Sequence, residues 1–568
     1  MRTAGRVHFE TGVLIVGAGA AGMSAAIAAH DAGVDTMLVD RSLIGRGGAT
    51  VMAQMTVAAA LGDEMEDDPS YHLADTLKAG RGLCDGALAT ALCEDAPRAI
   101  RQMDEWHVGW ARHEDGRLRQ AQAPGHNRPR CVYVDFLNTG PAVSRTLRAQ
   151  VQRRPAIRRI GELCMTDLVL ADGASCGAVG FSVTEGSVVS IAARAVIITT
   201  GGLTRLYKRN SASANMSGDG YALALRAGAD LIDMEFVQFF PIGHLAPRLI
   251  GMDPIMWDPF RYKLGGRLLN SDFREFINDY GVAESGHYEA TRDVATYAIL
   301  KEIEAGRSSP SGGVYLSFQH VPPEKLREAF GPVIDRLAAN NIDLTREPVE
   351  VAPIAHYHMG GIRVSETFET QIPGLFAAGE AVGGANGANR LSGNAITEAL
   401  VFGRRAGLSA AKSARGTHTP PWNETHASAS LAFANGAEPS KTNPAALIER
   451  LQIIMTERAG PFRTEGGLNA GLAEIREIIP QLGAAPPGSL GRFDTARLDW
   501  FDVRNMCLVA EAVLRTALAR RESRGAHQRG DYPHPVPEFL LHQRVRLDAG
   551  HLLLDQLRAA RVTEEAVQ

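Results

Sequence analysis

The run HYHMGG, residues 356–361, places two histidines two positions apart, ahead of a glycine pair. On a β-strand such residues point to the same face, so His356 and His358 could share a metal ion. Nothing nearby supplies the carboxylates or thiols that would complete such a site, and we expect no metal. Ligand binding, catalysis and burial in the core remain the alternatives for these two side chains.

A glycine-rich run near the start of the chain has the spacing of a dinucleotide site. An apolar stretch of strand length, 13–16, precedes three glycines and an alanine-rich helical segment that runs to about Asp31; a second apolar strand, 36–39, ends at Asp40. The glycines are Gly17, Gly19 and Gly22. They would let a pyrophosphate approach a helix N-terminus, while Asp40 could accept hydrogen bonds from an adenosine ribose. This order of elements is more specific than the glycines alone.

Composition is that of an ordinary soluble globular protein. The 568 residues, 45% of them apolar, suffice for two or three domains. The net charge of −5 is scattered, which argues against nucleic acid and against an acidic membrane surface as partners. The six cysteines show no CxxC pairing, so we expect reduced thiols and no zinc or iron–sulfur site. Without a signal peptide or a spanning segment, we predict a cytoplasmic protein with no direct membrane insertion, which could reach a membrane through a partner subunit.

The elements that must position these residues are distributed along the chain. Two further strand–glycine elements, 194–202 and 372–381, indicate that the dinucleotide domain is interrupted. The sequence between them is rich in aromatic and charged residues and is typical of an inserted domain that covers the reactive end of a cofactor. After about residue 410, a Pro- and Ser-rich linker precedes long helical periodicity. The domain limits we predict are 1–240 and 355–410 for the dinucleotide domain, 241–354 for the insertion, and 411–568 for the linker and a C-terminal helical domain.

From Gly12 to about Tyr532 the chain resembles the flavoprotein subunits of succinate dehydrogenase and fumarate reductase, a family that includes L-aspartate oxidase. The shared runs, in chain order, are VGAGAAG, TTGG, SGDG, MEFVQFFP, ATRDV, HYHMGGI, AAGEA, GANRLSGNA and ESRGAHQRGDYP. The resemblance implies an α/β chain with a Rossmann-type FAD-binding domain, interrupted by an α+β capping domain and followed by a C-terminal helical domain. It also implies FAD as the cofactor and hydride transfer at flavin N5.

The family's cofactor contacts can be carried over residue by residue. The positions implied are Gly17, Gly19, Ala20, Gly22, Asp40, Arg41, Thr50, Asp219, Glu380, Ala395 and Ile396. The helix that begins near Ala395 would direct its N-terminus at the flavin, where partial positive charge suits a reduced, anionic ring. Succinate dehydrogenases attach the flavin to a histidine, but Ala49 occupies that position here. We therefore predict that FAD is held without a covalent bond.

The resemblance also implies a proton group and a carboxylate clamp. Arg292 matches the family's proton donor, and Asp258 and Arg261 match the carboxylate and the arginine that reach it. An arginine is a poor base in water, because its pKa exceeds roughly 12. His356 and Arg390 match the residues that bind one substrate carboxylate; a guanidinium suits this task because it can donate two hydrogen bonds to one carboxylate.

Two departures concern the opposite end of the substrate. Phe240 and Trp257 replace a histidine and a threonine that bind the second carboxylate in succinate and fumarate enzymes. The sequence therefore predicts an FAD-dependent oxidoreductase that acts at a C–C bond next to a carboxylate, on a substrate other than plain succinate or fumarate.

Three alternatives stay open. The chain could be an amino acid oxidase like L-aspartate oxidase, the flavoprotein subunit of a complex like adenylylsulfate reductase, or a subunit whose partner holds the chemistry. The presence of Arg292, His356 and Arg390 argues against the last alternative, a subunit without chemistry of its own. The partners we expect are a small carboxylate and a separate iron–sulfur or other electron-transfer subunit.

Overall fold

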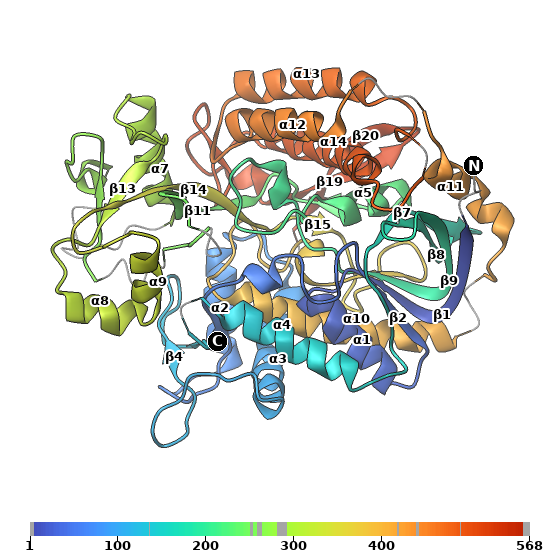
Figure 1. Cartoon of the computed structure of the whole chain (residues 1–568), viewed down its shortest axis with the longest axis horizontal. Helices are drawn as coiled ribbons and strands as arrows, with labels where there is room; N and C mark the ends of the chain where they lie inside the picture. Colours follow the sequence, from blue (N-terminus) through green and yellow to red (C-terminus); the bar gives the residue numbers. More distant parts are fainter. Residues whose placement is uncertain are drawn as a thin grey trace.

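A mostly parallel sheet carries the predicted dinucleotide elements (Figure 1). The computed structural model describes residues 5–135, 137–249, 254–257, 264–280, 292–416, 420–438, 442–488 and 490–559. Within them the sheet has seven strands, and β16 pairs with the end of β9 beside the path β6-β2-β1-β9-β8-β7. The strands are β1 (Arg6–Val16), β2 (Thr36–Val39), β6 (Arg158–Ile160), β7 (Leu163–Ala171), β8 (Ala174–Ser182), β9 (Ser187–Ile198) and β16 (Leu375–Ala377).

The predicted strand at 13–16 is the buried end of a longer strand. β1 begins at Arg6, and its first half pairs in parallel with β9 while staying largely exposed. Val13, Leu14 and Ile15 are completely buried, so the apolar run marks only the part of the strand that lies in the core. The strand predicted at 36–39 is β2, which pairs in parallel with β1.

Helices pack against this sheet (Figure 1). The helices of this part are α1 (Ala20–Asp31), α2 (Pro69–Ala79), α3 (Gly86–Glu105), α4 (Thr139–Gln152), α5 (Asp219–Arg226) and α10 (Asn394–Arg415). A Cβ at Gly403 or Gly407 of α10 would lie 2.3 or 2.4 Å from a backbone oxygen of α1. These glycines therefore let the two helix backbones touch.

The inserted segment has its own antiparallel sheet, in the order β11-β14-β13-β12. Its strands are β11 (Val237–Ala246), β12 (Arg267–Leu269), β13 (Val314–Ser317) and β14 (Val349–His358); its helices are α7 (Arg292–Glu304), α8 (Pro323–Phe330) and α9 (Val333–Ala339). A separate aromatic core, which includes Trp257, Phe318 and Phe330, holds this α+β unit together. It lies beside the part that carries the dinucleotide elements, at the left of Figure 1, and β11 and β14 connect the two.

The C-terminal part is helical until its last strands. It contains α11 (Glu424–Asn435), α12 (Pro444–Arg458), α13 (Glu465–Leu482) and α14 (Thr495–Ala519). A hairpin that sequence analysis did not anticipate, β19 (Leu541–Asp548) and β20 (His551–Arg558), pairs with β10 (Leu231–Ile232), which in turn pairs with β15 (Gly361–Ile362). Over the described residues, no helix combines the length and apolar character needed to cross a membrane.

Short elements complete the connections. The remaining strands are β3 (Val57–Ala58), β4 (Gln120–Ala121), β5 (Cys131–Val132), β17 (Phe462–Arg463) and β18 (Gln528–Arg529). The short 3-10 turns are η1 (Thr50–Met52), η2 (Thr204–Leu206), η3 (Ile277–Tyr280), η4 (Gly379–Ala381) and η5 (Pro537–Phe539). All six cysteines are buried, and none of them forms a disulfide among the described residues.

Candidate active site

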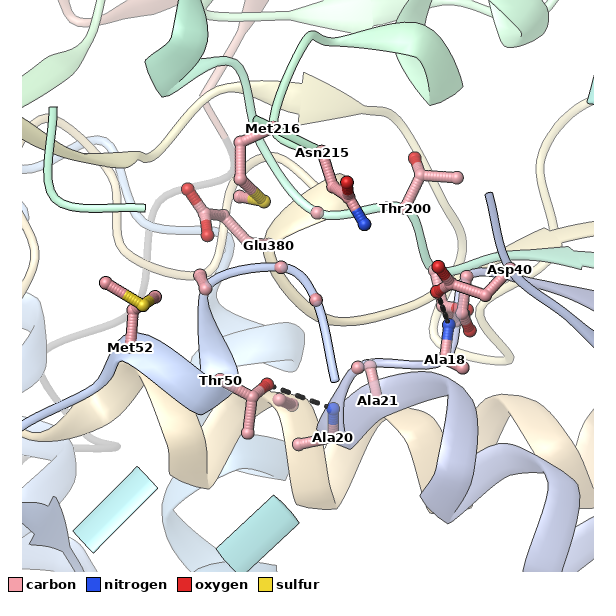
Figure 2. A pocket seen from close by; sticks show the side chains of 18 of the residues that line it. Ala18, Ala20, Ala21, Asp40, Thr50, Met52, Thr200, Asn215, Met216 and Glu380 are labelled. Atoms are coloured by element: carbon pink, nitrogen blue, oxygen red, sulfur yellow. Dashed lines mark hydrogen bonds between the residues drawn. The ribbon is translucent and has the colours of Figure 1, made fainter. Parts of the chain in front are cut away.

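A long pocket runs along the carboxyl ends of β1, β2 and β9 (Figure 2). Its wall combines the start of α1, the loop from Asp40 to Ala53, the segment around Asn215, and residues of the inserted segment and of α10. In an open α/β sheet this edge is where ligands bind. The predicted cofactor residues Gly17, Gly19, Ala20, Asp40, Arg41, Thr50, Asp219, Glu380, Ala395 and Ile396 all line this pocket.

The glycine turn has the shape that a bound pyrophosphate requires. Gly17 has a φ of 106°, which side chains rarely adopt, and a Cβ at Gly22 would lie 1.8 Å from the Gly17 oxygen. Only glycine fits at position 22, because α1 starts directly against the preceding strand. The Ala20 N–H donates to Thr50 Oγ1 at 3.0 Å, which fixes the loop from 40 to 53 over the helix start (Figure 2).

Asp40 is fixed by the chain itself. One carboxylate oxygen accepts from Ala18 N–H at 2.6 Å, and the other accepts from the N–H and hydroxyl of Ser42, both at 2.7 Å. Arg41 is also engaged: its guanidinium forms two hydrogen bonds to Asp502 of α14, at 2.6 and 2.7 Å. Arg41 therefore attaches the C-terminal helices to the rim of the pocket while still lining it.

The pocket contains buried polar atoms that lack a partner among the described residues. These are Thr200 Oγ1 and Asp219 Oδ1. Burial raises the pKa of Asp219 to about 6, against the lowering effect of Arg41. Burial likewise raises the pKa of Glu380 to about 8, against a hydrogen bond from His358 N–H. Because orphaned buried acceptors are costly, these residues fit a ligand that brings hydroxyl donors, as the ribityl chain and ribose of FAD do.

The N-terminus of α10 faces the same pocket. The residue before the helix is Gly393, in the left-handed conformation with φ 86°. Because glycine has no side chain, it forms no capping hydrogen bond with the first N–H groups of the helix. Ala395 and Ile396 in the first turn line the pocket. The helix dipole thus supplies partial positive charge at this wall.

His356 and His358 have different surroundings. His358 is completely buried, and its ring nitrogens bond Tyr221 Oη at 3.0 Å and Met234 O at 3.1 Å. Burial lowers the pKa of His358 to about 4, so this histidine is neutral and structural. His356 lines the pocket, and its Nδ1 bonds Ser211 Oγ at 2.8 Å. Ser211 also lines the pocket.

Arg390 is buried beside Tyr357, which lines the pocket. Its guanidinium carbon lies 4.4 Å from the centre of the Tyr357 ring, and one terminal N–H donates to Gln238 at 2.9 Å. The Arg390 Nε has no hydrogen-bond partner among the described residues. An unsatisfied donor on a buried cation suits an anionic ligand.

The two aromatic replacements both belong to the core of the inserted segment, and neither lines the pocket. Phe240 packs its ring edge-on to His356, with centroids 5.9 Å apart. Trp257 lies in the core of the inserted segment, 1% exposed, against Phe318 and Phe330 at 5.9 and 5.8 Å. Its neighbour Met256 lines the pocket. Sequence analysis placed both aromatics at the substrate; in the structure, Phe240 contacts the clamp, while Trp257 supports the wall from behind.

The predicted proton groups are Arg292, Asp258 and Arg261. Asp258 and Arg261 lie outside the described residues. Arg292 is the first residue of α7, and its side chain lies outside the description.

Several pocket residues escaped sequence analysis. They are Ser211, Thr200, Asn215, Met216, Met52 and Met256. Thr200 and Met216 lie in or beside the TTGG and SGDG runs, so those runs carried a usable signal. Ser211 lies in no quoted run, and its pairing with a histidine 145 residues away has no local signature.

Comparison with known proteins identifies the class. A family model described as "FAD binding domain" matches residues 12–396, and one described as "Fumarate reductase flavoprotein C-term" matches 448–560. The chain is 35% identical to a fumarate reductase (CoM/CoB) subunit of Methanothermobacter marburgensis over 94% of its own length and 96% of that protein. It is 33% identical to "L-aspartate oxidase" of Nostoc sp., covering 94% and 93%.

Solved structures indicate the same family. An Escherichia coli quinol fumarate reductase chain superimposes with a TM-score of 0.89 at 31% identity, covering 98% of each chain. This chain is therefore an FAD-dependent oxidoreductase. It belongs to the succinate dehydrogenase and fumarate reductase flavoprotein family.

Proposed function

We propose that the enzyme oxidises or reduces a C–C bond next to a carboxylate, on a substrate whose other end is larger or less polar than a second carboxylate. The observation that carries this proposal is the pair His356 and Arg390, one on the pocket wall and one directly behind it, with an unsatisfied donor on the buried guanidinium. Bound FAD would supply or accept the hydride, and Gly17, Asp219 and Glu380 are among the residues that would hold it.

Ser211 directs the imidazole of His356. Because Nδ1 bonds the Ser211 hydroxyl, Nε2 is the ring nitrogen that would contact the substrate. A hydroxyl can donate to a neutral ring or accept from a protonated one, so Ser211 supports either state. Arg390 then adds a positively charged contact to the same carboxylate.

Met256 on the pocket wall and Phe240, which packs against His356 from behind that wall, favour a less polar distal group. Burying an unpaired carboxylate against such side chains is prohibitively costly, whereas an apolar substituent would gain roughly 1.5 to 3 kcal/mol.

In our proposal Arg292 is the proton donor or acceptor, and Asp258 and Arg261 are the residues that reach it.

FAD is held non-covalently in this proposal, because Ala49 lines the pocket without a side chain able to form the bond. Electrons would pass to or from a separate iron–sulfur or other electron-transfer subunit, in a cytoplasmic complex. The support is that the fumarate reductase relatives are named as subunits.

Steady-state assays with an artificial electron carrier test this function. The panel contains succinate, fumarate, a series of substituted 2-enoates with their saturated forms, and aspartate. We expect turnover of the substituted monocarboxylates and poor turnover of succinate and fumarate, with Phe240→His improving the dicarboxylates. Efficient use of succinate or fumarate by the native enzyme, unimproved by Phe240→His, would contradict the proposal. Efficient oxidation of aspartate would favour the oxidase alternative, which the 33% identical Nostoc relative makes concrete.

A further inference from the structure

Glu398 is a completely buried carboxylate in the second turn of α10. One of its oxygens accepts from Tyr357 Oη at 2.7 Å and from Asn386 Nδ2 at 2.6 Å. The other oxygen has no partner among the described residues. Neither the cofactor contacts nor the proposed clamp gives this residue a task.

The contacts of Glu398 lead directly to the proposed clamp. Tyr357, held by its hydroxyl, presents its ring to the Arg390 guanidinium at 4.4 Å. Asn386, held by its amide, belongs to the same loop as Arg390. A single carboxylate therefore fixes both the surface against which Arg390 packs and the loop that carries it.

Arg390 of the clamp lies among buried acidic groups. Arg390 is within electrostatic range of Tyr357, Glu380 and Glu398, and burial lowers its pKa. Two buried acidic residues, Glu380 and Glu398, thus share the charge of Arg390 before any substrate arrives. A substrate carboxylate at Arg390 would add a negative charge beside these two residues, and like charges in a buried site favour protonation of one of the carboxyl groups.

We propose that Glu398 is a positioning residue of the clamp, which holds Tyr357 against Arg390, and that it takes up one proton when a substrate carboxylate pairs with Arg390. The inference rests on the substrate-binding role of Arg390 in the proposed function. Proton and substrate then stabilise each other's binding by the same factor.

The direction of the pH effect follows from the surroundings of Glu398. Burial raises its pKa to about 7, while the hydrogen bonds from Tyr357 and Asn386 lower it. Below this pH Glu398 is neutral and the clamp is ready for an anion. Above it the carboxylate competes with the substrate for the charge of Arg390, so affinity falls as pH rises. Glu380, with its pKa near 8, is the other group that could respond.

Equilibrium binding tests the proposal independently of turnover. Crotonate serves as the probe of the holoenzyme, binding is read from flavin absorbance between about pH 5.5 and 8.5, and proton uptake is measured with an indicator in weak buffer. We expect the native Kd to rise by up to about tenfold per pH unit above pH 7, with close to one proton taken up per ligand near pH 8. Glu398→Gln should bind tightly with no pH dependence in this range and take up no proton.

A second variant tests the geometry. Tyr357→Phe removes a hydrogen bond that favours the ionised form, so the midpoint of the pH dependence should move upward. Glu474→Gln, on α13 and paired with Arg458 at 2.9 Å on the surface, is the matched control and should behave as the native enzyme.

A native pH dependence in Glu398→Gln, or one with its midpoint near 8, would assign the proton elsewhere and overturn the proposal. Binding that is independent of pH in the native enzyme would overturn it while leaving the clamp intact. Failure of crotonate to bind at any pH would refute the clamp itself, and the proposed function with it.

Discussion

Replacement of Ser211 by alanine should weaken substrate binding more than it slows turnover. The Ser211 hydroxyl lies 2.8 Å from Nδ1 of His356, and its side chain is buried. Loss of such a hydrogen bond costs about 1 kcal/mol, and up to about 3 kcal/mol if the ring nitrogen stays buried without a partner. At about 1.4 kcal/mol per factor of ten, KM should rise by about 5-fold to 150-fold.

The assay is steady-state turnover of the best carboxylate in the panel, with binding followed separately by flavin absorbance. Ser211→Thr keeps the hydroxyl and should restore most of the affinity. Ser175→Ala removes a buried hydroxyl that has no partner among the described residues, at a site outside the pocket, and serves as the control. Unchanged KM in Ser211→Ala, or an equal loss in Ser211→Thr, would refute the orienting role of this hydroxyl.

Four further outcomes are expected. Acid precipitation should release all the flavin, because Ala49 offers no attachment; colour retained in the pellet would contradict this. Arg292→Gln should lower turnover by about 100-fold to 10,000-fold with an unchanged flavin spectrum, and normal turnover would reject its proton role. Gly407→Ala should lower the melting temperature, because the new Cβ would lie 2.4 Å from the Ala25 oxygen. Asp219 has a pKa raised to about 6, so its contribution to the stability of the apo-protein is greatest below the ordinary carboxyl pKa and is lost as pH rises through 6; Asp219→Asn should remove this pH dependence from thermal melts.

The sequence alone determined the features that depend on neighbours along the chain. The strand, glycine and helix order that makes the dinucleotide turn lies within about thirty residues, and each step follows from local sterics and hydrophobic periodicity. The family runs likewise predicted the FAD cofactor and the inserted architecture, which the comparisons confirm. The apolar run at 13–16 predicted only the buried end of β1, because an apolar run indicates which residues are buried and not how long the strand is.

Only the tertiary structure decided which side chains meet. Arg41 pairs with Asp502 from the far end of the chain, and Ser211 reaches His356 across 145 residues. The sequence did not predict that Glu398 accepts a hydrogen bond from Tyr357, because these two residues meet only when α10 packs near β14. Trp257 shows the limit most clearly: the sequence identified an aromatic at a substrate position, but the side chain turns inward, where packing against other aromatic rings buries its large apolar surface.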